Sequence, residues 1–204
     1  MRVTLQQVSK SFGRETVVRD LSHVLQPGSR TAILGPNGSG KSTLLQLIGG
    51  FSIPTRGTVT HELDGKAIEQ EHVYRHISIA APYMSLYEEL SLREAIASHK
   101  RFKPLRGSLS LEEVARISLL EKHLEKPVRD FSSGMKQRLK LTLGILSDTS
   151  LLLLDEPMSN LDTNGSVWFR EFLETNIGER TLVVASNRQA EETFACSASV
   201  DMGV

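Results

Sequence analysis

The sequence has one cysteine, Cys196, among 204 residues, and its 24 basic residues balance its 24 acidic ones. A single cysteine excludes a disulfide framework and favours a reducing compartment. A neutral chain lacks the bulk positive charge typical of proteins that bind nucleic acids or anionic membranes. No apolar run approaches the roughly 20 residues that span a bilayer, and residues 1–13 lack the apolar core of a signal peptide. We therefore expect a soluble, intracellular protein that reaches a membrane only through a partner.

A phosphate-binding pattern, G-x-x-x-x-G-K-[ST], occupies residues 35–43, which we call the phosphate loop and which read GPNGSGKST. The apolar run before it predicts a strand, and the apolar spacing after it predicts a helix, which is the context of a P-loop. Lys41 is expected to reach the β- and γ-phosphates of a nucleotide, and Ser42 to ligate Mg²⁺. A glycine-rich turn before a helix is the alternative. The candidate nucleotide-binding residues are Gly35, Pro36, Asn37, Gly38, Ser39, Gly40, Lys41, Ser42 and Thr43.

The rest of the chain alternates between strand and helix patterns. Strand patterns cover residues 3–8, 17–25, 30–34, 58–63, 76–81, 151–154, 181–185 and, more weakly, 197–202. Helical patterns dominate 91–147, where Ser110 and Glu113 form a capping box, and return at 164–176. We predict a single α/β domain over 1–204. Its core covers about 1–85 and 149–204, with an antiparallel β portion near the N-terminus, and a helical subdomain is inserted at about 86–148.

An acidic pair, Asp155 and Glu156, follows four consecutive leucines. The leucines predict a buried parallel strand, and α/β sheets place their ligands at the carboxyl ends of such strands. In P-loop proteins an aspartate there helps to hold Mg²⁺, and a following carboxylate can orient or deprotonate an attacking water. A buried strand ending in a solvated acidic turn is the alternative, which the phosphate loop upstream disfavours.

Together these motifs resemble the ATP-binding subunit of an ABC transporter along nearly the whole chain. The resemblance implies a P-loop NTPase core of the ABC ATPase type. Phe12, in SKSFG, matches the aromatic residue that stacks on adenine, although an early Phe by itself is more often a core residue. Residues 159–162, SNLD, match the loop that crosses between subunits.

A second motif of the family, the signature, corresponds to residues 131–138, FSSGMKQR. In the family this helix start faces the γ-phosphate held by the other subunit of a dimer. The resemblance therefore implies that Ser132 and Gly134 bind nucleotide across an interface. Without this context, FSSG would predict only a helix cap.

The sequence departs from the family's pattern at several positions. The signature has Phe131, Ser133 and Met135 where Leu, Gly and Gln are usual. Pro82 stands in place of a glutamine near Mg²⁺ and the membrane partner, and proline offers neither an amide side chain nor an N–H. Asn187 stands in place of the histidine that contacts the γ-phosphate, and it donates only a neutral hydrogen bond. We expect nucleotide binding to be firmer than hydrolysis, with Lys41, Glu156 and Asn187 as the catalytic residues.

The resemblance implies a function as well as a fold. It implies an ATPase that binds Mg-ATP, dimerises with it, and powers a permease carried on a separate membrane chain. The partner cassette is a second copy or a homologue, the location is the cytoplasmic face of the cell membrane, and no nucleic acid is expected. Residues 82–94, which we call the docking segment, would receive a cytoplasmic helix of the permease. The alternatives are that this segment packs internally, and that the chain is a soluble or weakly hydrolysing nucleotide-binding regulator without a permease.

Overall fold

The computed structural model describes residues 1–187 and 189–203, and its internal contacts divide the chain into two units that we describe separately. Unit 1 comprises residues 1–79, 149–156 and 179–204, and unit 2 comprises residues 80–148 and 157–178. Within the two described ranges, no helix is long and apolar enough to cross a membrane.

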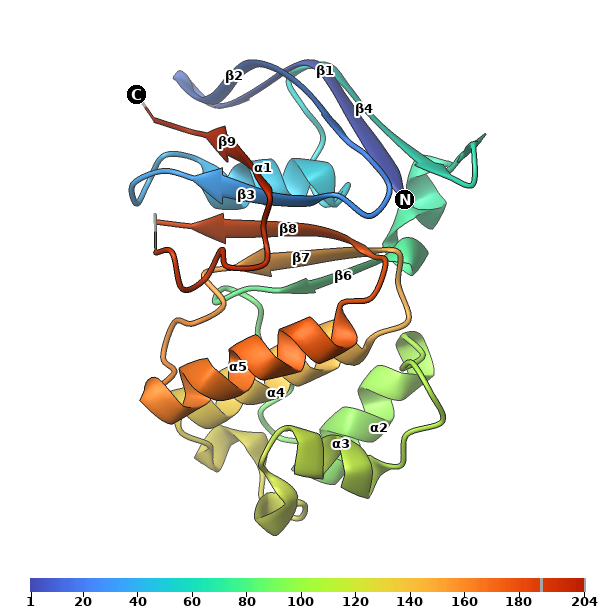
Figure 1. Ribbon diagram of the computed structural model, residues 1–204, viewed down its shortest axis with the longest axis vertical. Coiled ribbons are helices and arrows are strands. Elements are labelled where there is room, and N and C mark those ends of the chain that lie inside the picture. The colour runs from blue at the N-terminus through green and yellow to red at the C-terminus, as the bar shows by residue number, and fades with distance from the viewer. Residues whose placement is uncertain (188, 204) are drawn as a thin grey trace. The chain divides into compact units, whose positions relative to one another are not determined.

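Unit 1 is built on two β-sheets (Figure 1). The four-stranded antiparallel sheet has the order β2-β1-β4-β5 and consists of β1 (Arg2–Phe12), β2 (Glu15–Leu25), β4 (Arg56–Leu63) and β5 (Lys66–Ala67). The five-stranded sheet has the order β6-β7-β8-β3-β9 and consists of β3 (Arg30–Leu34), β6 (Ile77–Ala80), β7 (Leu151–Asp155), β8 (Thr181–Ser186) and β9 (Ala198–Asp201). Helix α1 (Lys41–Ile48) follows β3, and a 3-10 helix (Gln70–His76) precedes β6.

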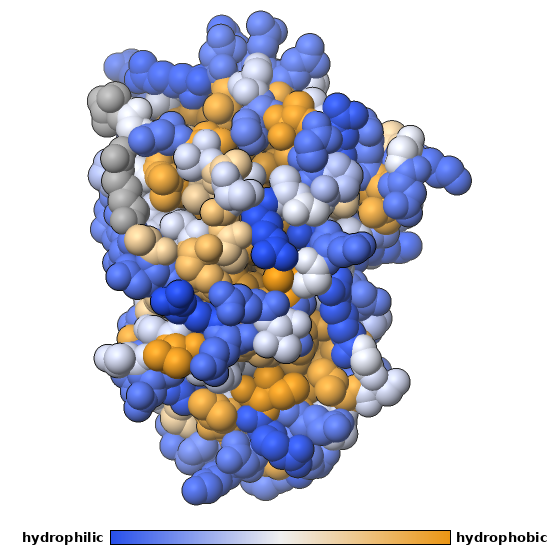
Figure 2. All heavy atoms as spheres, viewed as in Figure 1, coloured by the Kyte–Doolittle hydropathy of each residue, from blue (hydrophilic) through white to orange (hydrophobic). Residues whose placement is uncertain are grey.

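The burial of each strand follows from its sequence pattern. Every residue of β7 and β8 is buried, as expected for parallel strands that are covered on both faces. In β1, by contrast, Val3, Leu5 and Val8 enter the core while other positions face outward. The region of β1 and β2 is accordingly covered mostly by hydrophilic side chains in Figure 2. The predicted α/β fold with a separate antiparallel sheet is confirmed.

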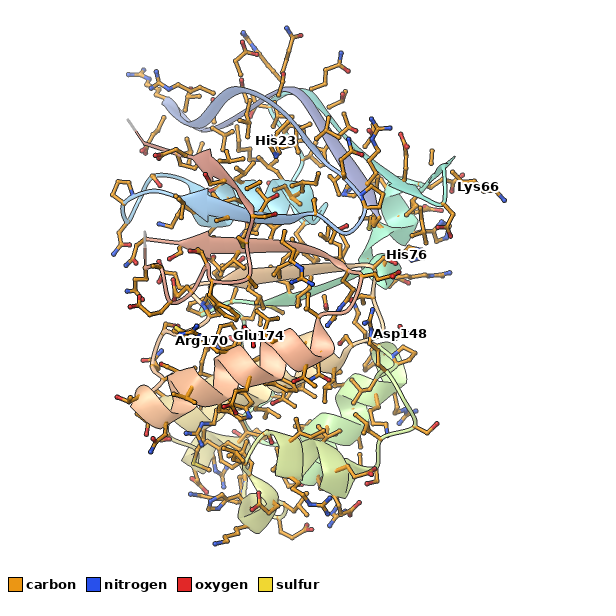
Figure 3. The ribbon with its side chains drawn as sticks, viewed as in Figure 1. His23, Lys66, His76, Asp148, Arg170 and Glu174 are labelled. Carbon is orange, nitrogen blue, oxygen red and sulfur yellow. The ribbon has the colours of Figure 1, made fainter. Side chains whose placement is uncertain are left out.

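A tight hairpin joins β4 to β5, as the Asp-Gly pair predicts. Asp64 and Gly65 both have positive φ, 51° and 76°, which is the backbone of a type I′ turn. Leu63 pairs with Lys66 across it, and Lys66 points away from the sheet (Figure 3).

Unit 2 is helical, and consists mainly of α2 (Leu92–Phe102), α3 (Leu111–Ile117), α4 (Ser133–Leu146) and α5 (Thr163–Asn176), with two short 3-10 turns at Glu121–His123 and Val128–Asp130. The expected capping box at Ser110 is present, and Ser91 forms a second one at the start of α2. Helices α4 and α5 lie side by side (Figure 1), and the Trp168 indole N–H donates to the carbonyl of Ile117 at 2.9 Å. These contacts group residues 157–178 with the other helices, so unit 2 is wider than the helical subdomain predicted at 86–148. The boundaries of that subdomain stay a prediction.

A partly buried histidine gives unit 2 a pH-sensitive contact. The Ser147 hydroxyl donates to the carbonyl of Leu143 at 2.6 Å, so the His99 ring, 2.9 Å from the same oxygen, contacts it through an Nε2–H. Burial, together with the smaller effect of the Lys103 charge, lowers the pKa of His99 to about 4. The imidazole is therefore neutral in the folded protein at pH 7.

We expect this histidine to make unit 2 less stable in weak acid. The pKa of His99 is lower in the folded protein than in the unfolded chain, so the unfolded chain binds the proton first as the pH falls. The contribution of neutral His99 to stability is therefore complete above pH 6.5 and is lost as the pH falls toward 4. The free energy of unfolding should drop by about 1–2 kcal/mol between pH 7 and pH 5 on account of this group. Urea unfolding of His99→Gln at both pH values should show that much less acid sensitivity than the wild type. Equal sensitivity would contradict the prediction.

Candidate functional site

The carboxyl ends of three parallel strands meet at one edge of the five-stranded sheet. Leu34, the last residue of β3, pairs with Ser186, the last residue of β8, and Asp155 at the end of β7 pairs one residue before Ser186. The phosphate loop directly follows β3, and Glu156 directly follows β7. The two motifs that the sequence singled out therefore lie at the edge where open α/β sheets bind ligands.

The phosphate loop depends on glycines for its curvature. Gly38 and Gly40 have φ values of 82° and 94°, and a Cβ on Gly40 would lie 2.5 Å from a methyl group of Val17. Helix α1 begins at the next residue, and no side chain caps it. The N–H groups of its first turn, at the positive end of the helix dipole, are therefore available to an anion.

Lys41 supplies a buried positive charge inside this loop. The residue is only 5% exposed, and its ammonium donates to the carbonyls of Gly35 at 2.9 Å and Pro36 at 3.0 Å. The loop thus wraps around the ammonium and holds it next to the N–H groups of α1. Two backbone carbonyls are weaker acceptors than a phosphate oxygen, so an arriving phosphate can compete for this ammonium.

Asp155 is buried and lacks the partners that a buried carboxylate requires. Its residue exposure is 2%, and neither carboxylate oxygen has a hydrogen-bond partner among the described residues. Burial raises the pKa of Asp155, as does Glu156, while the nearby Ser42 hydroxyl and the Lys41 ammonium act in the opposite direction. An unpaired buried carboxylate is costly unless a cation fills the site. With the Ser42 hydroxyl it forms an oxygen donor set that suits Mg²⁺.

Glu156 has a strained backbone that the sequence did not reveal. Its φ is 43°, in the left-handed region, which costs a residue with a Cβ about 1–2 kcal/mol. Its N–H donates to the carbonyl of Ala185 in β8 at 2.9 Å, which holds the turn in place. Such strain is concentrated at functional sites, where it directs a side chain.

An open cavity in unit 1 has a volume of about 480 Å³, a size typical of small-molecule sites, and Asp155 lies outside its lining. Phe12 lies at its wall and is 54% exposed, so one side of its ring is accessible. The cavity is lined by Phe12, Val17, Asn37, Gly38, Gly40, Lys41, Ser42, Thr43 and Glu156. The cavity thus brings Phe12 and Glu156 together with part of the phosphate loop, while Gly35, Pro36, Ser39 and Asp155 are not in its lining.

The signature residues form a separate cavity of about 360 Å³ within unit 2. Ser132 caps α4, a helix of 14 residues, by accepting a hydrogen bond from the N–H of Met135 at 3.2 Å. This bond uses the hydroxyl oxygen and not its hydrogen, which can be donated to a ligand. Gly134 lies where a Cβ would be 3.0 Å from the carbonyl oxygen of Asn160. Arg138 adds a positive charge to the lining and pairs with Asp162 at 3.4 Å.

The acidic residues of the docking segment are engaged within unit 2. Glu88 accepts from Lys136 of α4 at 2.6 Å, and Glu89 accepts from Arg129 at 2.8 Å. Both basic partners come from more than 35 residues away in the chain, so no local spacing pointed to them.

The two altered motif residues, Pro82 and Asn187, lie in different surroundings. The carbonyl of Pro82 accepts a hydrogen bond from Lys140 of α4 at 3.0 Å, so the segment after β6 is fixed through its main chain. Beyond it Tyr83, Met84 and Tyr87 are 48%, 38% and 75% exposed, which leaves an apolar surface. Asn187 is exposed directly after β8, and it is not among the residues that line the cavity in unit 1.

Comparison with known proteins agrees with these features. The family described as ABC transporter matches residues 18–159. The lantibiotic transport ATP-binding protein of Streptococcus pyogenes is 30% identical over 193 residues, which cover 92% of this chain and 80% of that protein. The sn-glycerol-3-phosphate import ATP-binding protein of Paracoccus denitrificans (strain Pd 1222) is 31% identical over 201 residues, covering 95% of this chain but only 56% of the importer subunit.

Comparison of the fold with solved structures points to the same family. A solved structure of an ATP-binding subunit of an ABC transporter superposes with a TM-score of 0.82 at 25% identity, covering 98% of this chain and 85% of that one. The chain therefore belongs to the ABC transporter family and is an ATP-binding cassette ATPase.

Proposed function

We propose that this chain binds and hydrolyses Mg-ATP in the cavity of unit 1 and uses the energy to drive a membrane transporter. The observation that carries the proposal is the convergence of a phosphate loop, a buried ammonium and the Glu156 carboxylate on one cavity, with the unpartnered buried carboxylate of Asp155 one residue before Glu156. A glycine-rich turn or a solvated acidic turn would need none of this burial. The membership of the family and the names of its relatives support the transport role.

The proposed roles follow from the chemistry of each group. Lys41 and the N–H groups of residues 38–42 bind the β- and γ-phosphates, because they combine a charge with several directed donors. Phe12 stacks on the nucleobase, since its ring is accessible at the cavity wall. The remaining residues of the loop, Gly35, Pro36, Asn37, Ser39 and Thr43, complete the phosphate cradle.

Ser42 and Asp155 fit a magnesium ion, as the orphaned carboxylate oxygens indicate. When bound there, Mg²⁺ would neutralise charge on the phosphates. Glu156 orients or deprotonates the water that attacks the γ-phosphate, and its left-handed backbone directs the side chain into the cavity. Asn187 offers a neutral amide where the family has an imidazole, so intrinsic turnover is slow.

The site in a single chain is proposed to be incomplete. The Ser132 hydroxyl and the start of α4 form an anion-binding surface of their own, with Gly134 giving close access to the backbone. We assign this surface to the γ-phosphate of ATP held by a second copy or a homologous cassette. ATP then joins two cassettes, and ADP, which lacks the bridging phosphate, does not.

The docking segment is proposed to bind the permease through its exposed aromatic residues. Tyr83, Met84 and Tyr87 provide the kind of anchor that is enriched in interfaces. Glu88 and Glu89 already pair within unit 2, so they shape this surface more than they attract a basic partner. The chain would then sit in the cytoplasm, at the cytoplasmic face of the membrane.

A weakly hydrolysing nucleotide-binding regulator without a permease is the second candidate, favoured by Pro82 and Asn187. Purification from membranes distinguishes the two. An integral membrane protein that co-purifies with the wild type, and is lost on Tyr87→Ala, supports the transporter. Recovery of the chain without any membrane protein supports the regulator.

The chemical step can be tested at Glu156. Glu156→Gln keeps the shape of the side chain but removes the base, so ATP binding should persist while turnover falls by about 10²–10⁴-fold. Phosphate release and ATP binding should be measured on the same preparation, with the surface variant Glu179→Gln as the control. Turnover at the wild-type rate would reduce Glu156 to a structural acid.

Dimerisation can be tested in the same Glu156→Gln background by sedimentation velocity. The protein should be monomeric without nucleotide or with ADP, and dimeric with ATP. Adding Ser132→Arg puts a bulky cation into the proposed interface and should abolish the dimer while ATP still binds. Ser110→Arg is the matched control, because it removes a helix cap of the same type in α3. Dimers that survive Ser132→Arg, or a parent that stays monomeric with ATP, would refute this interface.

A further inference from the structure

The ring of Phe12 is held by little apolar packing. Phe12 is the last residue of β1, and more than half of it is exposed. A side chain free to change rotamer loses that freedom when it stacks on a ligand, which weakens binding. A contact that fixes the ring beforehand would reduce this loss.

Lys10 makes such a contact. It lies two residues earlier on β1, so its side chain leaves the same face of the strand. The Lys10 ammonium is 5.1 Å from the centre of the Phe12 ring, within the range of a cation–π interaction. Lys10 is not among the residues that line the cavity, so its contact with the ring does not occupy the cavity wall.

The ammonium is itself anchored. It donates to the carbonyl of Ile53 at 2.8 Å. That carbonyl belongs to a short segment fixed to β1 at Thr55, whose N–H donates to the carbonyl of Ser9 at 2.8 Å and whose hydroxyl accepts from the N–H of Ser11 at 3.0 Å. The charge over the ring is thus held by a segment that is itself fixed to β1.

We propose that Lys10 is a positioning residue for nucleotide binding: it holds the Phe12 ring in the orientation that stacks on the nucleobase. The inference rests on the proposed role of Phe12. Lys10 acts through the ring and not on the phosphates, so its contribution should depend on the presence of a base.

The test compares ATP with inorganic tripolyphosphate, which has the phosphates but no base. Calorimetric titration of the full chain should give a dissociation constant for Mg-ATP that Lys10→Met raises about two- to five-fold. The dissociation constant for tripolyphosphate should stay unchanged. Lys10→Arg, which keeps a cation for the ring, should restore most of the ATP affinity. Lys66→Met, which removes an exposed charge from the β4–β5 hairpin (Figure 3), should change neither constant.

Two further variants test whether Lys10 acts on ATP binding through the Phe12 ring. In a Phe12→Ala background, Lys10→Met should have no additional effect on ATP binding. Thr55→Val removes a hydroxyl that fixes the segment carrying Ile53 but keeps the cation, so it should weaken ATP binding by no more than Lys10→Met does and leave tripolyphosphate binding unchanged.

Each outcome has a distinct meaning. Equal weakening of ATP and tripolyphosphate, an effect that persists without Phe12, or a larger loss of ATP affinity on Thr55→Val than on Lys10→Met would each overturn the positioning role of Lys10. So would an unchanged ATP affinity on Lys10→Met when Phe12→Ala does weaken ATP relative to tripolyphosphate. If Phe12→Ala itself leaves that ratio unchanged, the proposed stacking role of Phe12 fails, and the role of Lys10 fails with it.

Discussion

A carboxylate buried at the end of an apolar strand is the constraint on which unit 1 depends. The leucines of β7 bring Asp155 to the sheet edge, where both of its oxygens lack a partner among the described residues. The sheet tolerates this cost because β7 lies between β6 and β8 and every residue in it is buried. Nearby, the Ser42 hydroxyl and the Lys41 charge lower the pKa of Asp155, which burial raises. Local stability is given up for a site that a cation and a polyphosphate would complete.

The strained and buried groups of unit 1 serve one arrangement. Gly40 bends the phosphate loop so that α1 starts with uncapped N–H groups, and Glu156 adopts a left-handed backbone at the end of β7. Unit 2 has its own cavity at Ser132, where the proposed second anion-binding surface lies. In the proposed mechanism these two surfaces come from different copies, so nucleotide binding and assembly become one event. In the proposed positioning role, the Lys10–Phe12 contact holds the ring on which the base stacks.

Much of this could be predicted from the sequence, because the strongest signals are local. The glycine spacing of the phosphate loop, the leucine run before Asp155 and the Asp-Gly turn each dictate a backbone within a few residues. What could not be predicted depends on tertiary contacts. The pairing of Glu88 with Lys136, for instance, joins residues far apart in the chain. The positive φ of Glu156 has no local signature either, since Glu has no preference for that conformation.

The most direct measurement concerns the balance between stability and binding at Asp155. Urea unfolding should be followed with and without saturating Mg-ATP for the wild type, for Asp155→Asn, and for the control Glu174→Gln, an exposed residue of α5 that is labelled in Figure 3. Without ligand, Asp155→Asn should be more stable than the wild type by about 1 kcal/mol, because it removes an unpaired buried charge. Mg-ATP at about 100 times its dissociation constant should stabilise the wild type and the control by about 2.7 kcal/mol, and the variant by much less. An Asp155→Asn protein that is less stable without ligand, or that gains as much from Mg-ATP as the wild type, would contradict the central claim.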